Sequence, residues 1–139
     1  MLFRSDTNLA SEFHVLSCLH RLGAQASLTL GNKKSVDIFV ACGSKTVTIE
    51  VKGVAGPYDW PADNIPQEHR NSHFVVLVSY NGQIANTTIS PLIWVIPHHM
   101  IGKYIRQYKN RRNVSRAVVR RDGGRYQDAW HLIVGEDVK

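Results

Sequence analysis

The sequence has few of the features that mark secreted or membrane proteins. It contains only two cysteines, Cys18 and Cys42, at unrelated positions, so it offers neither a disulfide framework nor a zinc-binding spacing. No apolar run approaches the ~18 residues of a membrane span, and the first residues lack the apolar core of a signal peptide. We therefore expect a cytoplasmic protein with no membrane partner.

Acidic residues are also scarce. The chain has 11 Asp and Glu against 17 Lys and Arg, a formal net charge of +6. This excess favours an anionic partner, either a nucleic acid or a membrane surface, and charge alone does not choose between them. With 139 residues, 43% of them hydrophobic, the chain is long enough for one globular domain over 1–139.

The stretch at 36–52, V-D-I-F-V-A-C-G-S-K-T-V-T-I-E-V-K, is the most informative part of the sequence. Two β-rich runs, 36–42 and 45–51, flank Gly43 and Ser44. A glycine at the first position of a two-residue loop favours a type II′ turn. The stretch therefore predicts a β-hairpin with a fixed register.

The predicted register brings two carboxylates together. If Cys42 pairs with Lys45, Asp37 lies directly opposite Glu50, and Lys52 shares their face because side chains alternate along a strand. Opposed carboxylates repel each other, whereas Mg²⁺ commonly binds one or two carboxylates with several waters. Lys52 could then hold or activate a water, or neutralise a phosphate. The alternative is an edge-strand ion pair of Glu50 with Lys52 or Lys45, which would contribute little stability.

A helix is predicted before the hairpin, from Asp6 or Thr7 to Leu22. Its expected apolar stripe consists of Leu9, Phe13, Leu16 and Leu19. Glu12 lies within this stripe, so its carboxylate is expected to point into the protein, where it needs a partner. It is either a structural glutamate, the flank of a wide apolar face, or part of a site with the hairpin carboxylates.

The remaining expected elements are three strands and two helices, and one long loop lies among them. We expect strands at 25–30, 73–80 and 93–97, a helix from 98 through 105, and a last helix at 126–134. The loop at 53–72 is rich in Gly and Pro, and such a long loop in a small domain is more often functional than idle. Its Tyr58 and Trp60 either stack on bases or cover the core, and Asp59 and Asp63 are expected to cap the loop.

Basic residues are concentrated near the C-terminus, with no acidic residue among them. These residues are Lys103, Arg106, Lys109, Arg111, Arg112, Arg116, Arg120 and Arg121. A solvated charged face is one interpretation, but a run of one sign repels itself and is better explained by contact with phosphates. Among the seven histidines, His69 and His73 have i, i+4 spacing, but the strand expected at His73 argues against a metal site there.

The order of these features resembles the PD-(D/E)xK nuclease superfamily, which has the restriction-endonuclease-like fold. The resemblance rests on a helix with an inward Glu, a strand, D-x12-E-x-K on a hairpin, and later apolar strands. It is most similar to small archaeal Holliday junction resolvase-like domains and uncharacterised bacterial endonuclease-like domains. It implies an α/β fold, with a central mixed sheet of four to five strands flanked by helices in the order αβββαβ. One departure is Val36, where the motif name has Pro.

The resemblance also implies an activity. The chain would be a metal-dependent endonuclease that hydrolyses DNA phosphodiester bonds, with selectivity for structures such as junctions. Asp37, Glu50 and the backbone oxygen of Val51 would bind Mg²⁺ or Mn²⁺, and Glu12 would complete the site directly or through water. Lys52 would orient or deprotonate the attacking water.

The same resemblance implies DNA as the partner, held through its backbone without base readout, and a homodimer. The residues expected to hold the DNA are Lys33, Lys34, Arg106, Lys109, Arg111, Arg112, Arg116, Arg120 and Arg121. Two alternatives remain: a catalytically silent nucleic-acid-binding module with the same fold, and a protein-interaction domain that borrows it.

Overall fold

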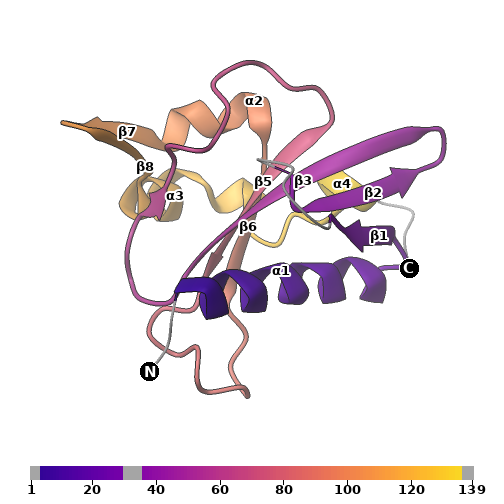
Figure 1. Cartoon of the computed structure of the whole chain (residues 1–139), viewed down its shortest axis with the longest axis horizontal. Helices are drawn as coiled ribbons and strands as arrows, with labels where there is room; N and C mark the ends of the chain where they lie inside the picture. The colour runs from indigo at the N-terminus through magenta and orange to yellow at the C-terminus, as the bar shows by residue number, and fades with distance from the viewer. Residues whose placement is uncertain (1–3, 30–35, 136–139) are drawn as a thin grey trace.

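The computed structural model describes residues 4–29 and 36–135 and has a five-stranded mixed β-sheet at its centre (Figure 1). The strands lie in the order β1-β2-β3-β5-β6, with β3 and β5 parallel and each other neighbouring pair antiparallel. Their bounds are β1 Gln25–Leu28, β2 Ile38–Cys42, β3 Lys45–Val54, β5 His73–Ser79 and β6 Leu92–Pro97. The expected α/β class and strand number are confirmed.

Helices and a second, smaller sheet flank this sheet. The helices are α1 Arg4–Arg21, α2 His98–Ile101, α3 Arg116–Asp122 and α4 His131–Val134. The small sheet has the order β4-β8-β7, with β4 Trp60–Pro61, β7 Ile105–Tyr108 and β8 Arg111–Val114. None of the described helices is long and apolar enough to cross a membrane.

The order of elements differs from αβββαβ at one point. Between β3 and β5 the described chain forms a loop with only the short strand β4, rather than a helix. The Gly- and Pro-rich composition of 53–72 explains this, because neither residue favours a helix interior. The parallel crossover from β3 to β5 is therefore made by a loop.

The hairpin β2–β3 has the predicted register. Cys42 pairs with Lys45 and Ile38 pairs with Ile49. Gly43 has a φ of +63°, and the following serine has no positive φ, as a type II′ turn requires. The turn and the hydrophobic alternation together therefore fix where each hairpin side chain points.

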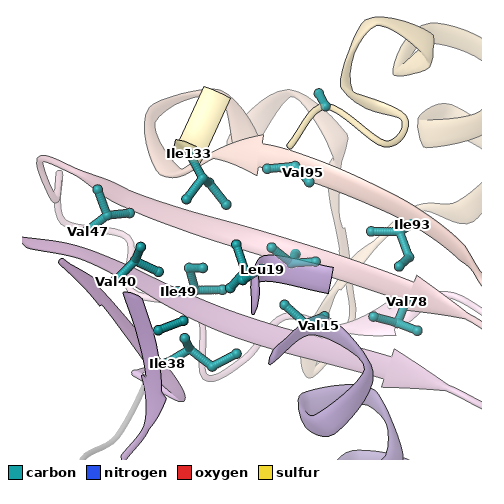
Figure 2. Packing of buried hydrophobic residues seen from close by; sticks show 13 residues of the cluster. Val15, Leu19, Ile38, Val40, Val47, Ile49, Val78, Ile93, Val95 and Ile133 are labelled. Carbon is teal, nitrogen blue, oxygen red and sulfur yellow. The ribbon is translucent and has the colours of Figure 1, made fainter. Parts of the chain in front are cut away.

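Two hydrophobic clusters lie on the two faces of the sheet. In the first, Val15 and Leu19 of α1 pack against Ile38, Val40 and Ile49 (Figure 2). The second includes Trp60, Ile65, Leu77, Trp94, Ile96, Tyr104, Val114 and Val119. Successive β5 side chains belong alternately to the two clusters, because side chains alternate along a strand. The continuous apolar run of β5 is thus explained by burial on both faces.

The buried face of α1 is not the predicted apolar stripe. Leu9 and Phe13 are 52% and 54% exposed, so the prediction was wrong for these two residues. Leu19 is buried and Leu16 packs against the first cluster, as predicted. The other buried positions are Thr7, Ser11 and Val15. A Cβ placed on Gly53 would overlap Ser11, which shows how closely α1 approaches β3. Small side chains permit this approach, and a pattern of large apolar residues does not reveal it.

The C-terminal part of the chain contains less helix than predicted. After α2 the chain turns through Gly102–Tyr104 into the β7–β8 hairpin instead of continuing as a helix to 105. The last helix begins at His131 rather than Tyr126. Ala129 and Ile133 are nevertheless buried.

Candidate functional site

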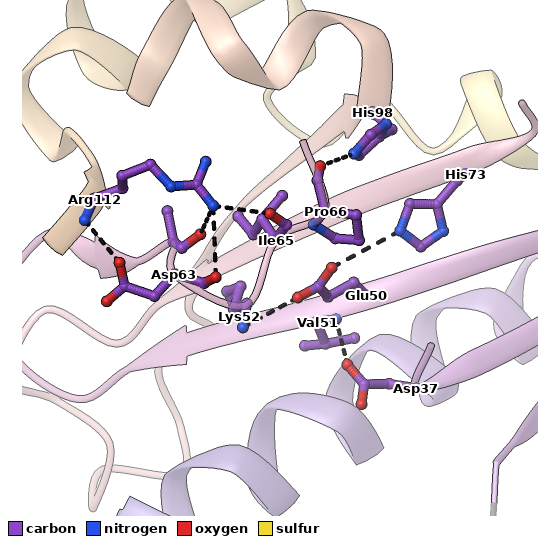
Figure 3. Close-up of polar contacts among 11 residues, drawn as sticks. Asp37, Glu50, Val51, Lys52, Asp63, Ile65, Pro66, His73, His98 and Arg112 are labelled. Atoms are coloured by element: carbon purple, nitrogen blue, oxygen red, sulfur yellow. Dashed lines mark hydrogen bonds and ion pairs between the residues drawn. The ribbon is translucent and has the colours of Figure 1, made fainter. Parts of the chain in front are cut away.

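The Asp37 carboxylate lies beside β3, next to the point where β2 begins. The Asp37 backbone N–H donates to the Ile49 carbonyl at 2.8 Å, and the Val51 N–H donates to Asp37 Oδ2 at 2.7 Å (Figure 3). Because N–H and C=O of one strand residue point to the same side, the Val51 carbonyl also faces the edge occupied by Asp37. The register with β2 begins at Ile38. A carboxylate and a backbone carbonyl therefore meet at this edge.

Glu50 and Lys52 form the next part of the site. The Glu50 side chain is 3% exposed, and its Oε2 lies 3.1 Å from Lys52 Nζ. Its other oxygen, Oε1, lies 3.8 Å from His73 Nε2, and within the described part of the chain neither of these two buried atoms has a hydrogen-bond partner. The Glu50–Lys52 pair exists, but it is not an edge-strand pair, because β3 lies between β2 and β5. A buried carboxylate with one unpartnered oxygen is poorly compensated by the protein alone.

His73 supports Glu50 from the neighbouring strand. The parallel register places His73 beside Thr48, whose Oγ1 lies 2.7 Å from His73 Nδ1. The His73 ring makes an edge contact with His98, at 5.4 Å between centroids. This residue was missed as part of the site, because sequence alone did not show that β3 and β5 pair in parallel.

His98 is held as a neutral ring. Its Nε2 lies 2.6 Å from the Pro66 carbonyl oxygen, and its Nδ1 accepts from the Arg70 N–H at 3.3 Å. An Nδ1 that accepts carries no proton, so Nε2 is the donor. Burial lowers the pKa of His98, although its contact with Pro66 opposes that shift. The histidines beside Glu50 therefore have structural partners.

Glu12 lies half-buried on α1, beside the buried positions. Burial raises the pKa of Glu12, and the charge of Asp37 raises it further. Burial also raises the pKa of Asp37, the Val51 N–H opposes this effect, and the charge of Glu50 adds to it. Asp37 thus lies near enough to Glu12 to raise the pKa of Glu12, and Glu50 lies near enough to Asp37 to raise the pKa of Asp37. The positive charge of Lys52 lowers the pKa of Asp37, but it does not offset the larger effect of burial.

The donor set can hold a hard divalent cation, although not through three side chains. No group of three or more His, Cys, Asp or Glu residues suited to a metal occurs among the described residues. Mg²⁺ is commonly bound by one or two carboxylates with several waters. Asp37, the unpartnered oxygen of Glu50 and the Val51 carbonyl fit that pattern. Glu12 fits an outer position better than direct ligation.

The structure divides the predicted DNA-binding residues into two groups. Lys33 and Lys34 lie outside the described residues. Arg112 is engaged inside the protein: its Nη2 donates to the carbonyls of Ala62 and Ile65 at 2.9 and 3.0 Å, and its N–H donates to Asp63 Oδ1 (Figure 3). Arg112 therefore fastens the loop after β4, which makes it a poor phosphate ligand.

Other arginines are partly engaged as well. Arg116 donates to Asn81 Oδ1 at 3.0 Å, and its N–H donates to Asp59 Oδ1. Arg121 pairs with Asp122 at 2.9 Å. Asp59 and Asp63, which were expected to cap the loop, instead each accept from the backbone N–H of an arginine distant in sequence and so tie the loop to α3 and β8. Within the basic run from Lys103 to Arg121, the exposed residues are Lys103, Arg106, Lys109, Arg111, Arg120 and Arg121.

The two loop aromatics have different positions. Trp60 is fully buried, donates from its indole N–H to the Val78 carbonyl at 3.0 Å, and packs edge-on against Trp94. It belongs to the core. Tyr58, in contrast, is 67% exposed. Of these two loop residues, therefore, Tyr58 has a ring that is accessible to a base.

A groove of about 990 Å³ extends from Lys52 to the basic hairpin β7–β8. One wall is the start of α1 with Thr7 and Asn8, and the floor continues from Lys52 along β3. The other wall is formed by the loop at 55–64 and by the hairpin. The groove thus extends from Lys52, the ion-pair partner of Glu50, to Arg111 on the β7–β8 hairpin.

The fold has a counterpart among solved structures. The chain is similar to the bacterial homing endonuclease I-Ssp6803I, with a TM-score of 0.61, 17% identity, and coverage of 96% of this chain and 93% of that chain. At this identity the likeness shows a shared fold. No protein-family model matches the chain, and no curated protein matches it.

Proposed function

We propose that this chain is a Mg²⁺- or Mn²⁺-dependent endonuclease that hydrolyses DNA phosphodiester bonds at Asp37, Glu50 and Lys52. The observation that carries the proposal is the buried Glu50 carboxylate, whose Oε1 has no hydrogen-bond partner among the described residues. Glu50 lies beside Lys52, and its charge contributes to the raised pKa of Asp37. The fold shared with a homing endonuclease supports the same reading.

Asp37, Glu50 and the Val51 carbonyl would hold the cation. When bound, Mg²⁺ or Mn²⁺ would neutralise charge that develops on the scissile phosphate and would lower the pKa of an attacking water. Asp37 is already oriented by the Val51 N–H, and Glu50 by Lys52. Both carboxylates are therefore positioned before substrate arrives.

Lys52 would act on the water and the phosphate. Its side chain is 19% exposed and lines the groove, so its ammonium can reach a phosphate while it remains beside Glu50. Glu12 would contribute through a water, as its half-buried position on α1 suggests.

These roles correspond to the PD-(D/E)xK pattern that the sequence resembles. Arg106, Lys109 and Arg111, which are exposed on and beside the turn of the β7–β8 hairpin, would hold the DNA backbone, a role that carries no sequence information. A two-fold dimer acting on a branched substrate would follow from the resolvase-like resemblance. Two-fold dimers are the commonest oligomers.

The test is cleavage of labelled linear duplex, single-stranded and four-way-junction DNA with Mg²⁺, Mn²⁺ or EDTA. The wild type should cut at least one of these DNAs with a metal and none with EDTA. Asp37→Ala should abolish cutting, and the exposed control Asp122→Ala should not. Cutting by Asp37→Ala at the wild-type rate would place the chemistry elsewhere. No cutting by the wild type would favour the silent binding module.

A further inference from the structure

Two exposed tyrosines line the groove that begins at Lys52. Tyr58 is 67% exposed and Tyr108 is 46% exposed, and both contribute to its walls. Arg111 pairs with Tyr108 across the β7–β8 hairpin and also lines the groove. A groove that combines cations with exposed aromatic rings is the pattern that binds single-stranded nucleic acid, because every base offers a face for stacking.

The Tyr58 ring lies close to Gly56 in spite of its exposure. A Cβ added to Gly56 would overlap the edge of that ring, so the ring lies against the bare Gly56 backbone. Gly56 has no positive φ, and therefore its lack of a side chain is explained by the ring rather than by a strained backbone. A ring with one side supported and much of its surface open to solvent is a preformed stacking surface.

The volume of the groove favours one strand over two. At about 990 Å³, it lies at the upper end of the range for small-molecule sites, roughly 300–1,000 Å³. That space suits a few nucleotides of one strand. The acidic Asp59 in its wall is already bonded to the Arg116 N–H, whereas Lys52 and Arg111 supply positive charge at either side.

We infer that the groove binds a short unpaired segment of a DNA strand, with bases stacked on Tyr58 and Tyr108, next to the phosphate that Lys52 contacts. This inference rests on the proposed nuclease function and narrows its substrate to DNA with unpaired nucleotides beside the cut. Paired bases in a continuous duplex are stacked on each other and cannot present a face to Tyr58. The preferred DNA therefore contains a gap, a flap or a single strand.

The test measures binding by fluorescence anisotropy in EDTA, which stops cutting. Three DNAs of one sequence are compared: a continuous duplex, the same duplex with a short gap in one strand, and the single strand. The wild-type chain should bind the gapped and single-stranded DNAs more tightly than the duplex. Tyr58→Ala should weaken binding to those two DNAs by about 5- to 150-fold, the range for loss of one stacked base.

Two further variants separate stacking from other effects. Tyr58→Phe keeps the ring and should bind like the wild type. Gly56→Ala should displace the ring and weaken binding as Tyr58→Ala does, whereas the control Gly102→Ala should not, because a Cβ at Gly102 meets no atom within 4 Å. Circular dichroism melting checks that each variant is folded.

The outcomes are distinct from those of the nuclease test. Equal wild-type affinity for duplex and gapped DNA, or unchanged affinity in Tyr58→Ala and Gly56→Ala, would overturn the inference even if the wild type cuts duplex DNA. Failure to cut any DNA with Mn²⁺ would overturn the proposed function. The anisotropy result would then still decide whether the groove binds unpaired DNA.

Discussion

The hairpins β2–β3 and β7–β8 differ in how far their charged side chains are buried. In the first, Glu50 is buried and Asp37 is half-buried, and each is held by a named contact. In the second, Arg106, Lys109 and Arg111 are exposed. Buried charges are costly unless they are compensated, whereas exposed charges are solvated cheaply. Under the proposed function, the buried charges of the first hairpin would carry the chemistry and the exposed charges of the second would supply affinity for DNA.

Loss of Lys52 should have the largest effect and should separate the two roles. Lys52→Ala is expected to lower single-turnover cleavage with Mn²⁺ by at least about 10²-fold, the usual contribution of a positioned acid or base. Binding in EDTA should change little, because Arg111 also lines the groove and Arg106 and Lys109 are exposed on the same hairpin. The matched control Lys109→Ala should cut normally at saturating DNA. A Lys52→Ala variant that cuts well but binds poorly would reverse the roles of the two hairpins.

Removal of exposed charge from β7–β8 should weaken binding without stopping chemistry. We expect the triple change of Arg106, Lys109 and Arg111 to Ala to reduce the slope of log affinity against log salt by up to about 3. Each lost phosphate contact accounts for about 0.9 of that slope. Cleavage at saturating DNA should persist. An unchanged slope would remove this hairpin from the DNA interface.

Arg111 and Arg112 are neighbours on β8, but they should differ in how much they contribute to the free energy of unfolding. Arg112→Ala is expected to lower the free energy of unfolding by about 1–3 kcal/mol, because its guanidinium hydrogen bonds to the loop carbonyls are lost. Arg111→Ala should leave that free energy nearly unchanged, since Arg111 is exposed. Urea unfolding followed by circular dichroism measures both. Equal losses in the two variants would mean that the Arg112 contacts contribute nothing specific.

The smallest effect concerns the pH dependence of stability near Glu50. Burial lowers the pKa of His98 below its ordinary value of 6.5. The stability that His98 contributes is therefore present above pH 6.5 and is lost as pH falls through the lowered pKa, with a slope of at most about 1.4 kcal/mol per pH unit. His98→Gln should flatten this slope in urea unfolding between pH 7 and pH 5. An identical slope in the variant would assign the pH dependence to other groups.

The sequence predicts the first hairpin well because its information is local. A glycine in the turn and alternating apolar residues fix the register from Cys42 with Lys45 to Ile38 with Ile49, and hence the face that Glu50 and Lys52 share. Asp37 was expected directly opposite Glu50, but it lies just before this register begins. The Asp37 contact with the Val51 N–H is not visible in the sequence. It depends on where the pairing with β2 begins.

The second hairpin and the packing of α1 were not predictable in the same way. The basic run 105–114 has no turn glycine, and its strands form beside β4, which is distant in sequence. The buried face of α1 includes Thr7 and Ser11 because Gly53 allows close approach. The roles of Arg112 and His73 likewise depend on contacts between distant segments. Such contacts follow from the tertiary fold, and a local pattern does not contain them.

The most direct test of the account is a calorimetric titration of the wild type with Mn²⁺ beside Asp37→Asn and the exposed control Asp122→Asn. The account predicts that the wild type and Asp122→Asn bind Mn²⁺ at one site and that Asp37→Asn loses this binding while it remains folded. Asn keeps the shape of Asp37 and can still accept from the Val51 N–H, so only the charge is removed. Equal Mn²⁺ binding by all three proteins, or by none, would contradict the claim that β2–β3 carries the metal site.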